Sequence, residues 1–337
     1  MLFRSIHKMI IGFLKKNPLW ALILTPIIAI VVWVHSYLHH FAIVESGTPL
    51  YENLIAAIGP SNKIAFALLG FALVLSQAIH LNYILVRFEV LYKQSWMSSV
   101  FYILLMSIIP QFVVFHPILI INSIIILQLS YIFQLYKGTD TFGLDFNICA
   151  LTGIASMLYI PALLLLLLYF IALMILKPFA WRDWIIGILG LATPYIFIFV
   201  YFFLTDQYNY LSTKFFITNI QQQFDFLKIF PMNFVISVAF VAVLFLLSLI
   251  RLGTNFYKNV IRSRNYQQIL LISLLVLSAI VLISTETMLF KFTILCTPLS
   301  VLIGYYFIAA KKPLWYETLF ILLLANIVFN YYVSVNH

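Results

Sequence analysis

The chain has 337 residues, of which 64% are hydrophobic and only 9% are charged, and its formal net charge is +9. Soluble domains carry about a quarter charged residues, so this composition excludes a soluble protein and predicts an all-α, polytopic bundle of transmembrane helices. The basic residues lie in short loops between apolar segments. This placement argues against nucleic acid as a partner, because such residues usually orient membrane spans. Cys149 and Cys296 lie in separate apolar segments and show no metal-binding or redox spacing.

The chain begins with a basic, amphipathic segment. Residues 1–17 place basic side chains among apolar ones at helical spacing, which predicts a helix that lies on the membrane surface. Lys15 and Lys16 interrupt the first apolar run, and no small-residue cleavage site follows, so we expect no cleavable signal peptide. Residues 18–337 are predicted to form a single transmembrane domain.

The apolar segments that follow predict membrane spans joined by short polar turns. The expected spans cover residues 18–37, 64–85, 97–114, 118–134, 185–204, 232–250, 268–284, 288–308 and 314–333. A longer polar segment, residues 205–231, is rich in aromatic residues and is expected to rest on the membrane interface.

The stretch from residue 146 to residue 177 decides the topology of everything after it. About thirty residues without a charge are too many for one ordinary span, which needs about 20. Pro161 lies near the middle of the run. We therefore expect two short segments, 146–157 and 160–176, joined near Tyr159 and Pro161.

The distribution of Lys and Arg tests this division. If the N-terminus is cytoplasmic and the spans alternate, 15 of the 19 Lys and Arg residues fall inside, a clear positive-inside asymmetry. The count holds only if Lys137 and Lys177 lie on the same side, so the segment between them must enter the membrane and return. Irregular backbone at membrane depth is tolerated only inside protein or beside a cavity, so we expect this short or re-entrant helix pair to be central. The prediction is about 11 spans with the C-terminus external.

The first external loop carries the residues best suited to chemistry. His35 and His39 share one helix face, His40 follows, and Glu45 and Glu52 add carboxylates. Histidines and a carboxylate could bind a divalent metal, and a carboxylate could act as a general base. The alternative is a loop whose polar residues simply face water, which is favoured because the spacing matches no established metal signature.

Two features near or within the spans also invite interpretation. Lys177, Trp181, Arg182 and Trp184 belong to the sequence KPFAWRDW, which is typical of a cytoplasmic anchor with tryptophans at headgroup level. An anionic-lipid site is the alternative there. His80 lies within an expected span, where an ionisable residue is a functional hypothesis and a hydrogen-bonded neutral imidazole is equally plausible.

Several of these segments together resemble a known group of proteins. A Gly-Ile-Ala-Ser segment, a Tyr-Ile-Pro turn, a long Leu run and KPFAWRDW resemble an uncharacterised family of multi-spanning inner-membrane proteins of Bacteroidota-type bacteria. More distantly, the pattern is similar to the GT-C superfamily of polyprenol-dependent glycosyltransferases, over about residues 18–210, with additional spans over 232–333. That resemblance implies an acidic catalytic residue in the first external loop, Glu45 or Glu52, a polyprenyl-linked lipid as substrate and a divalent cation as cofactor. The residues by themselves indicate no cofactor.

Two functions therefore remain open, and the sequence does not decide whether the chain is an enzyme. The first is a GT-C-like protein of the bacterial inner membrane that acts on lipid-linked glycans at the outer face. The alternative is a non-catalytic subunit or scaffold of a secretion, translocation or envelope-assembly complex, with other membrane proteins as partners. A transporter ranks last, because no internal repeat is evident.

Overall fold

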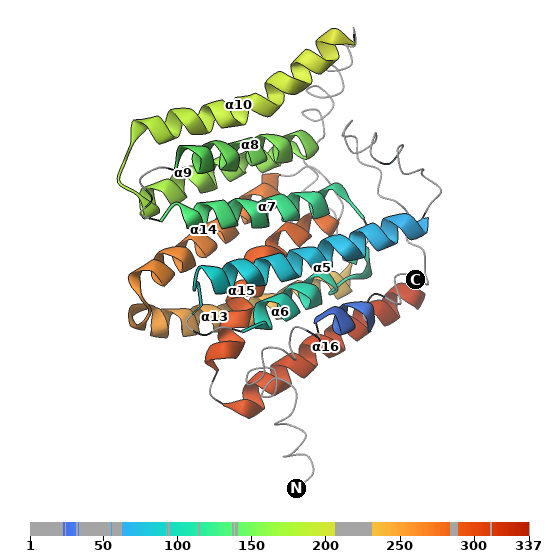
Figure 1. Cartoon of the computed structure of the whole chain (residues 1–337). Helices are drawn as coiled ribbons and strands as arrows, with labels where there is room; N and C mark the ends of the chain where they lie inside the picture. The colour runs from blue at the N-terminus through green and yellow to red at the C-terminus, as the bar shows by residue number, and fades with distance from the viewer. Residues whose placement is uncertain are drawn as a thin grey trace.

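The computed structural model describes residues 63–91, 95–113, 115–136, 141–205, 231–283, 289–310 and 312–336, together with positions 23, 25–31, 33, 55, 93 and 138. Every regular element in these ranges is a helix (Figure 1). The α-helices are α5 (Lys63–Arg87), α6 (Met97–Met106), α7 (Pro117–Gln134), α8 (Phe142–Leu158), α9 (Leu165–Leu176), α10 (Trp181–Leu204), α13 (Met232–Asn255), α14 (Ile261–Ile283), α15 (Cys296–Ala309) and α16 (Pro313–Asn336). Short 3-10 helices are η1 (Pro110–Val113), η2 (Ile160–Leu164), η4 (Phe256–Lys258) and η5 (Leu289–Leu295).

Seven helices of the described ranges are long and apolar enough to cross a membrane, which confirms the predicted all-α membrane bundle. They cover Ile64–Arg87, Pro117–Gln134, Trp181–Leu204, Met232–Lys258, Ile261–Ile283, Leu289–Ala309 and Pro313–Ser334. Three further apolar helices, Met97–Met106, Phe142–Leu158 and Ile160–Leu176, are shorter. The count of 11 spans and the orientation of the termini stay predictions.

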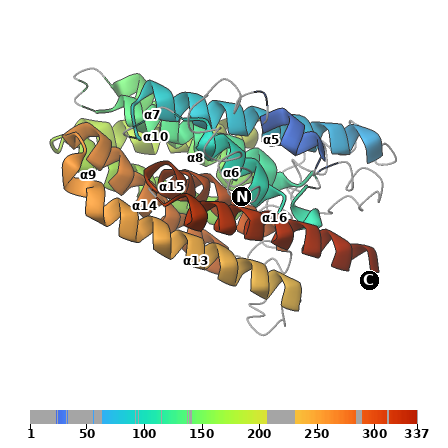
Figure 2. The ribbon, with the colours of Figure 1, turned by 90° about the horizontal axis from the view of Figure 1, so that it is seen from below.

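Most of the helices lie side by side with their long axes broadly aligned, and α10 forms one edge of the bundle (Figures 1 and 2). The centre is built on α6 and α15. All ten residues of α6 are buried, and nearly all of α15 is buried as well. The two helices approach closely at Gly304, where a Cβ would meet Ser98 Oγ at 2.8 Å. The rings of Phe101 and Phe307 pack beside this contact at 4.4 Å between centroids.

The helix pair around Pro161 follows the predicted division. α8 ends at Leu158, Tyr159 adopts an extended conformation, and η2 leads into α9. A residue before proline disfavours the α conformation, and proline itself fits the first turn of a new helix, which explains a break at this point. Lys177 at the end of α9 contacts Asp145 in the first turn of α8, so the chain does return to the same end of the bundle.

The predicted central position of this pair is only partly observed. Tyr159 and Ala162 at the junction are buried, as irregular backbone at membrane depth requires. However, the pair lies toward one edge, between α7 and α10 (Figure 1), and Leu163, Leu167 and Met174 are exposed on its outer side.

The expected span 97–114 is the clearest difference from the sequence prediction. Its α-helix stops at Met106 and gives way to a turn and η1, which begins at Pro110. Proline cannot continue the backbone hydrogen bonding of a helix interior, so hydropathy alone overestimates the helix length.

His116 is the N-cap residue of α7. The Nδ1 atom of His116 accepts a hydrogen bond from Leu119 N at 3.2 Å, and Pro117 occupies the first helical position. Burial lowers the pKa of His116 to about 3, so the imidazole is neutral at pH 7 and free to act as this acceptor.

Small residues allow α8 and α10 to pack with their backbones in contact. A Cβ added at Gly190 of α10 would collide with the carbonyl oxygen of Phe146 of α8. A Cβ added at Gly153 of α8 would lie 2.9 Å from Leu191 O of α10. Close helix approach through small residues is a common packing mode in membranes, where dispersion contacts replace the hydrophobic effect.

We expect Gly190→Leu to destabilise the protein by about 1–3 kcal/mol, because the added side chain must force α8 and α10 apart. The matched control is Gly253→Leu, since a Cβ at this other helical glycine meets nothing within 4 Å. Thermal unfolding in detergent, read by a thiol-reactive dye on the buried Cys149 and Cys296, measures both variants. Equal melting temperatures for the two variants would contradict the close contact.

Candidate functional site

Three helix ends meet at one place in the bundle, namely the starts of α8 and α10 and the end of α9. Asp145 lies in the first turn of α8, Asp183 lies in the first turn of α10, and Lys177 directly follows α9. Helix N-termini carry partial positive charge and C-termini partial negative charge. Each charged side chain is therefore at the helix end that favours it, before any contact between the side chains is considered.

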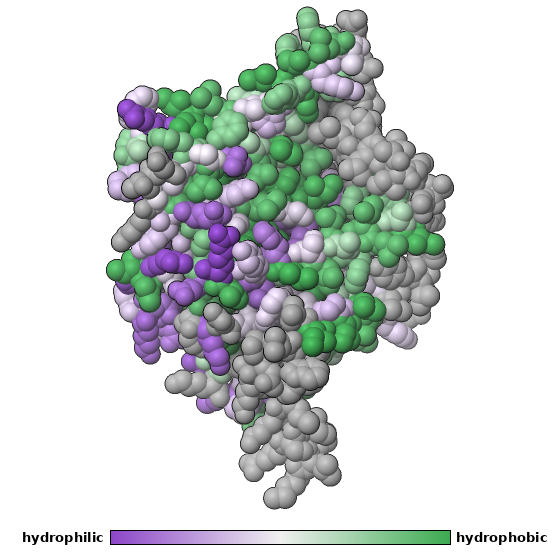
Figure 3. Space-filling model, in the orientation of Figure 1, coloured by the Kyte–Doolittle hydropathy of each residue, from purple (hydrophilic) through white to green (hydrophobic). Residues whose placement is uncertain are grey.

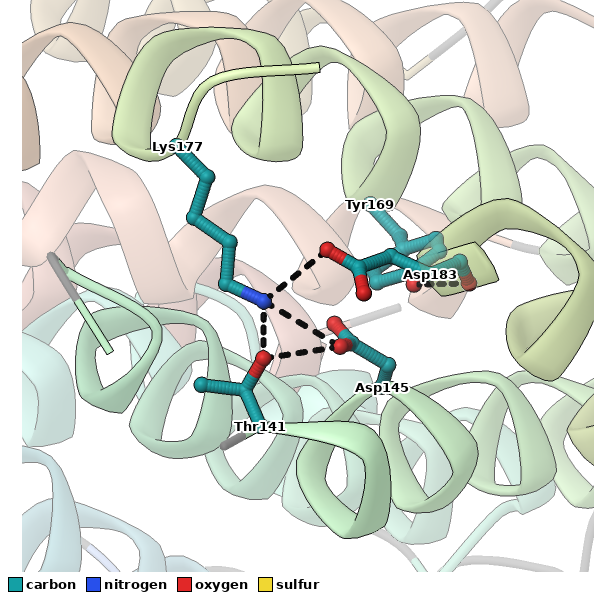
Figure 4. Close-up of polar contacts among 5 residues, drawn as sticks. All are labelled: Thr141, Asp145, Tyr169, Lys177 and Asp183. Carbon is teal, nitrogen blue, oxygen red and sulfur yellow. Dashed lines mark hydrogen bonds and ion pairs between the residues drawn. The ribbon is translucent and has the colours of Figure 1, made fainter. Parts of the chain in front are cut away.

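The ammonium of Lys177 lies between the two carboxylates (Figure 4). Its Nζ atom is 3.2 Å from Asp145 Oδ2 and 3.1 Å from Asp183 Oδ2. Thr141, the residue before α8, donates its hydroxyl to Asp145 Oδ2 at 3.0 Å and also contacts the Lys177 ammonium. The Tyr169 hydroxyl of α9 donates to the carbonyl oxygen of Asp183 at 3.1 Å. We call these five residues the Lys177 cluster.

The Lys177 cluster is closed to solvent. The side chains of Lys177, Asp145 and Asp183 are 7%, 0% and 8% exposed. Charges buried this deeply lose their hydration, and only well-placed partners offset that loss. At Asp145 burial raises the pKa, and the hydrogen bonds from Thr141 and Lys177 offset part of this rise.

One atom of the Lys177 cluster remains without a partner. Asp145 Oδ1 is buried and makes no hydrogen bond within the described part of the chain. With two carboxylates to one ammonium, the site carries an excess of acceptor oxygen atoms. Within the described ranges no group of three or more His, Cys, Asp or Glu is placed to hold a metal ion. The direct effect of these contacts is structural, because they join the ends of α8, α9 and α10.

The four residues of the predicted cytoplasmic anchor face different surroundings. Trp181 is 60% exposed, and the Arg182 guanidinium lies over its ring at 5.9 Å. Trp184 stacks on Phe170 at 4.3 Å between centroids. Lys177, in contrast, points inward to its two aspartates. Trp181 and Arg182 are placed to contact lipid headgroups, and this contact stays a prediction.

The candidate residues of the first external loop, His35, His39, His40, Glu45 and Glu52, lie outside the described residues. The segment that follows them is partly placed. Ile55 packs against Phe66 of α5 and Phe115, just before α7. This contact lies at the end of the bundle opposite the Lys177 cluster (Figure 1).

The Lys177 cluster is not evident from the uncharged run between residues 146 and 177. Asp145 precedes that run by one residue, and Asp183 belongs to the KPFAWRDW sequence, which is typical of an interfacial anchor. A usable signal exists: an aspartate and a lysine that bracket an uncharged helix pair must approach each other if the pair returns to one side.

We expect Lys177→Met to destabilise the fold by about 3–5 kcal/mol, because it leaves two buried carboxylates without their cation. Adding Asp145→Asn to this variant should restore part of the loss. The control Lys258→Met removes an exposed lysine and should change the stability by less than about 0.5 kcal/mol. Thermal unfolding of the purified proteins gives the values, and wild-type stability in Lys177→Met would show that the cluster does not fasten the helices.

The chain was compared with protein-family models, with curated proteins and with solved structures. No family model, no curated protein and no solved structure matches it. A function must therefore be argued from the residues and the geometry of this chain.

Proposed function

We propose that this chain is a multi-pass protein of the bacterial inner membrane with a GT-C-like architecture, and that it acts on lipid-linked glycans at the outer face. The orientation is supported by the placement of the basic residues. Most basic residues of the described ranges lie at the helix ends on the left of Figure 1, with Lys63 and Lys291 at the other end. The group comprises Arg87, Lys93, Lys177, Arg182, Arg251, Lys258, Arg262, Arg264 and Lys312. Hydrophilic side chains are concentrated on the same side of the surface in Figure 3. Basic residues favour the cytoplasmic side, so this end is assigned to the cytoplasm.

The observation that carries the activity is an apolar pocket at the opposite end. Its volume is about 100 Å³, and it is lined where α6 and η1 meet the first turns of α13 and the η5–α15 segment. Phe112, Phe234 and Phe292 belong to the wall, which is almost entirely apolar. Such a pocket suits part of a polyprenyl chain, since each buried CH₂ group contributes about 0.8 kcal/mol.

The first external loop supplies the reactive groups in this proposal. Its proximity to the pocket end is supported by Ile55, which packs against Phe66 and Phe115 at the end of the bundle opposite the basic group. A carboxylate of Glu45 or Glu52 would deprotonate the acceptor, and a divalent cation would neutralise the leaving phosphate. The described helices would hold the lipid tail, while the loop acts on the sugar.

We expect Glu45→Gln and Glu52→Gln, singly and together, to lower the transfer of the glycan by roughly 100-fold or more for the residue that acts as the base. The readout is the profile of cell-envelope glycans and glycoproteins in cells that carry each variant. Glu89→Gln, an exposed acid at the basic end, is the control. Unchanged profiles in the double variant, with normal protein levels, would exclude the catalytic proposal.

The alternative function, a non-catalytic membrane subunit, is favoured by α10. Of its 24 residues only Asp183, Gly187 and Gly190 are buried, while the second half exposes large apolar side chains such as Phe197 and Phe203. A helix of this kind can face lipid or another membrane protein.

Purification in mild detergent followed by mass spectrometry separates the two functions. A subunit should retain a stoichiometric protein partner, and that partner should be lost when Phe197 and Phe203 are replaced by Ala. A GT-C-like enzyme should instead be isolated without a partner and with bound polyprenyl lipid.

A further inference from the structure

A polar stripe runs along one face of α5. Ser76, His80, Tyr83 and Arg87 follow one another at intervals of four, three and four residues, so they share a helix face. The stripe lies on the outside of the bundle, where Tyr83 is 52% exposed. We call these four residues the α5 polar stripe. It lies within a predicted membrane span, where polar side chains are costly unless they find a partner.

Three members of the α5 polar stripe contact one another in sequence. The Arg87 guanidinium lies over the Tyr83 ring at 5.9 Å and donates to the Tyr83 hydroxyl at 3.4 Å. The Tyr83 ring in turn stacks on His80 at 6.2 Å between centroids. His80 Nε2 makes no hydrogen bond within the described part of the chain. The stripe thus connects a cation at the cytoplasmic end of α5 to an unsatisfied nitrogen within the membrane.

A groove of about 540 Å³ lies beside the α5 polar stripe, between α5 and α7. Ser76, His80 and Tyr83 line one side, and Ser123 of α7 adds a further hydroxyl. The remaining wall is apolar and consists of Ile79, Ile126 and Leu127. This volume is in the usual range for a small-molecule site, and the mixture of apolar walls with a few polar groups is typical of one.

The floor of this groove is held rigidly. The Gln77 amide donates to Leu119 O at 2.6 Å and to Ser123 Oγ at 2.7 Å. The Tyr102 hydroxyl donates to Gln77 Oε1 at 2.7 Å, which fixes α6 to the same residue. These bonds satisfy Gln77 fully and set the separation of α5 and α7, so the groove is present before any ligand arrives.

We propose that this groove binds an anionic phospholipid of the cytoplasmic leaflet. Its phosphate lies at Arg87, which makes no ion pair within the described ranges and therefore keeps its charge available. Tyr83 lies about 6 Å and His80 about 10 Å deeper along the helix, at about 1.5 Å rise per residue. They meet the ester oxygens, and the acyl chain follows Ile79, Ile126 and Leu127.

Charge and shape favour a lipid over a water-soluble anion. Lys93 and Arg262 lie at the same end of the bundle as Arg87, so this end carries positive charge that attracts anionic headgroups. A soluble phosphate would use only the mouth and would leave the apolar wall bare. This inner-leaflet site lies away from the outer pocket of the proposed function and does not depend on it.

The test measures which lipid the protein retains. Native mass spectrometry of the detergent-purified protein, supplied with equal amounts of phosphatidylglycerol and phosphatidylcholine, should show retained phosphatidylglycerol. Arg87→Gln should lower that retention by roughly tenfold, since it removes a charge-assisted hydrogen bond. The control Lys258→Gln removes one exposed positive charge at the same end without touching the groove and should leave retention unchanged.

A second variant tests the apolar half of the groove. Leu127→Trp, which fills the groove from α7, should displace the lipid while Arg87 stays intact. Thermal unfolding identifies variants that fold normally, and only these are compared. Equal loss in Arg87→Gln and Lys258→Gln, equal retention of both lipids, or displacement of the lipid by inorganic phosphate would each overturn the proposal. A copurifying protein in place of the lipid would overturn it as well.

Discussion

The ammonium of Lys177, held between two carboxylates, is the contact on which the arrangement of α8, α9 and α10 depends. Without it, only close packing such as that of Gly190 against Phe146 would hold these helices together, because burial from water does not drive helix association within lipid. The ion pairs specify which helix ends meet, whereas dispersion forces are not specific for one partner. Helix dipoles of the same sign at the starts of α8 and α10 reinforce this arrangement, since both ends favour an acidic residue.

The same principle extends to the rest of the bundle, where single polar side chains join helices that are far apart in the sequence. Asn330 of α16 donates to Ile108 O at 2.9 Å and to Ser237 Oγ of α13 at 2.7 Å. Tyr266 of α14 donates to Phe133 O of α7 at 2.8 Å. Each bond satisfies a polar group that is buried away from water, so the bonds specify which helices become neighbours.

Close packing and polar contacts divide the molecule into parts with different surroundings. The centre, built on α6 and α15, is buried on all sides, whereas α10 touches the bundle mainly through its first half. The α5 polar stripe runs from the middle of α5 to its last residue, whereas the outer apolar pocket lies near the start of α13. The proposed lipid contact at the cytoplasmic leaflet and the proposed chemistry at the outer face therefore share no residues.

The sequence by itself determined the class of protein, most helix positions and the fold-back near Pro161. Hydropathy and charge act locally, so 64% hydrophobic residues, a proline inside a long apolar run and loops rich in Lys and Arg are sufficient for these conclusions. The positive-inside count predicts that Lys137 and Lys177 share one side, which requires the chain to return. It overestimated the helix that starts at Met97, because hydropathy does not detect the break before Pro110. Only the tertiary structure decided that Asp145, Lys177 and Asp183 meet, that Gly190 lies against Phe146, and that His80 borders a groove. These contacts join residues from separate helices. Packing geometry decides which residues meet, and a local pattern of residues does not contain that information.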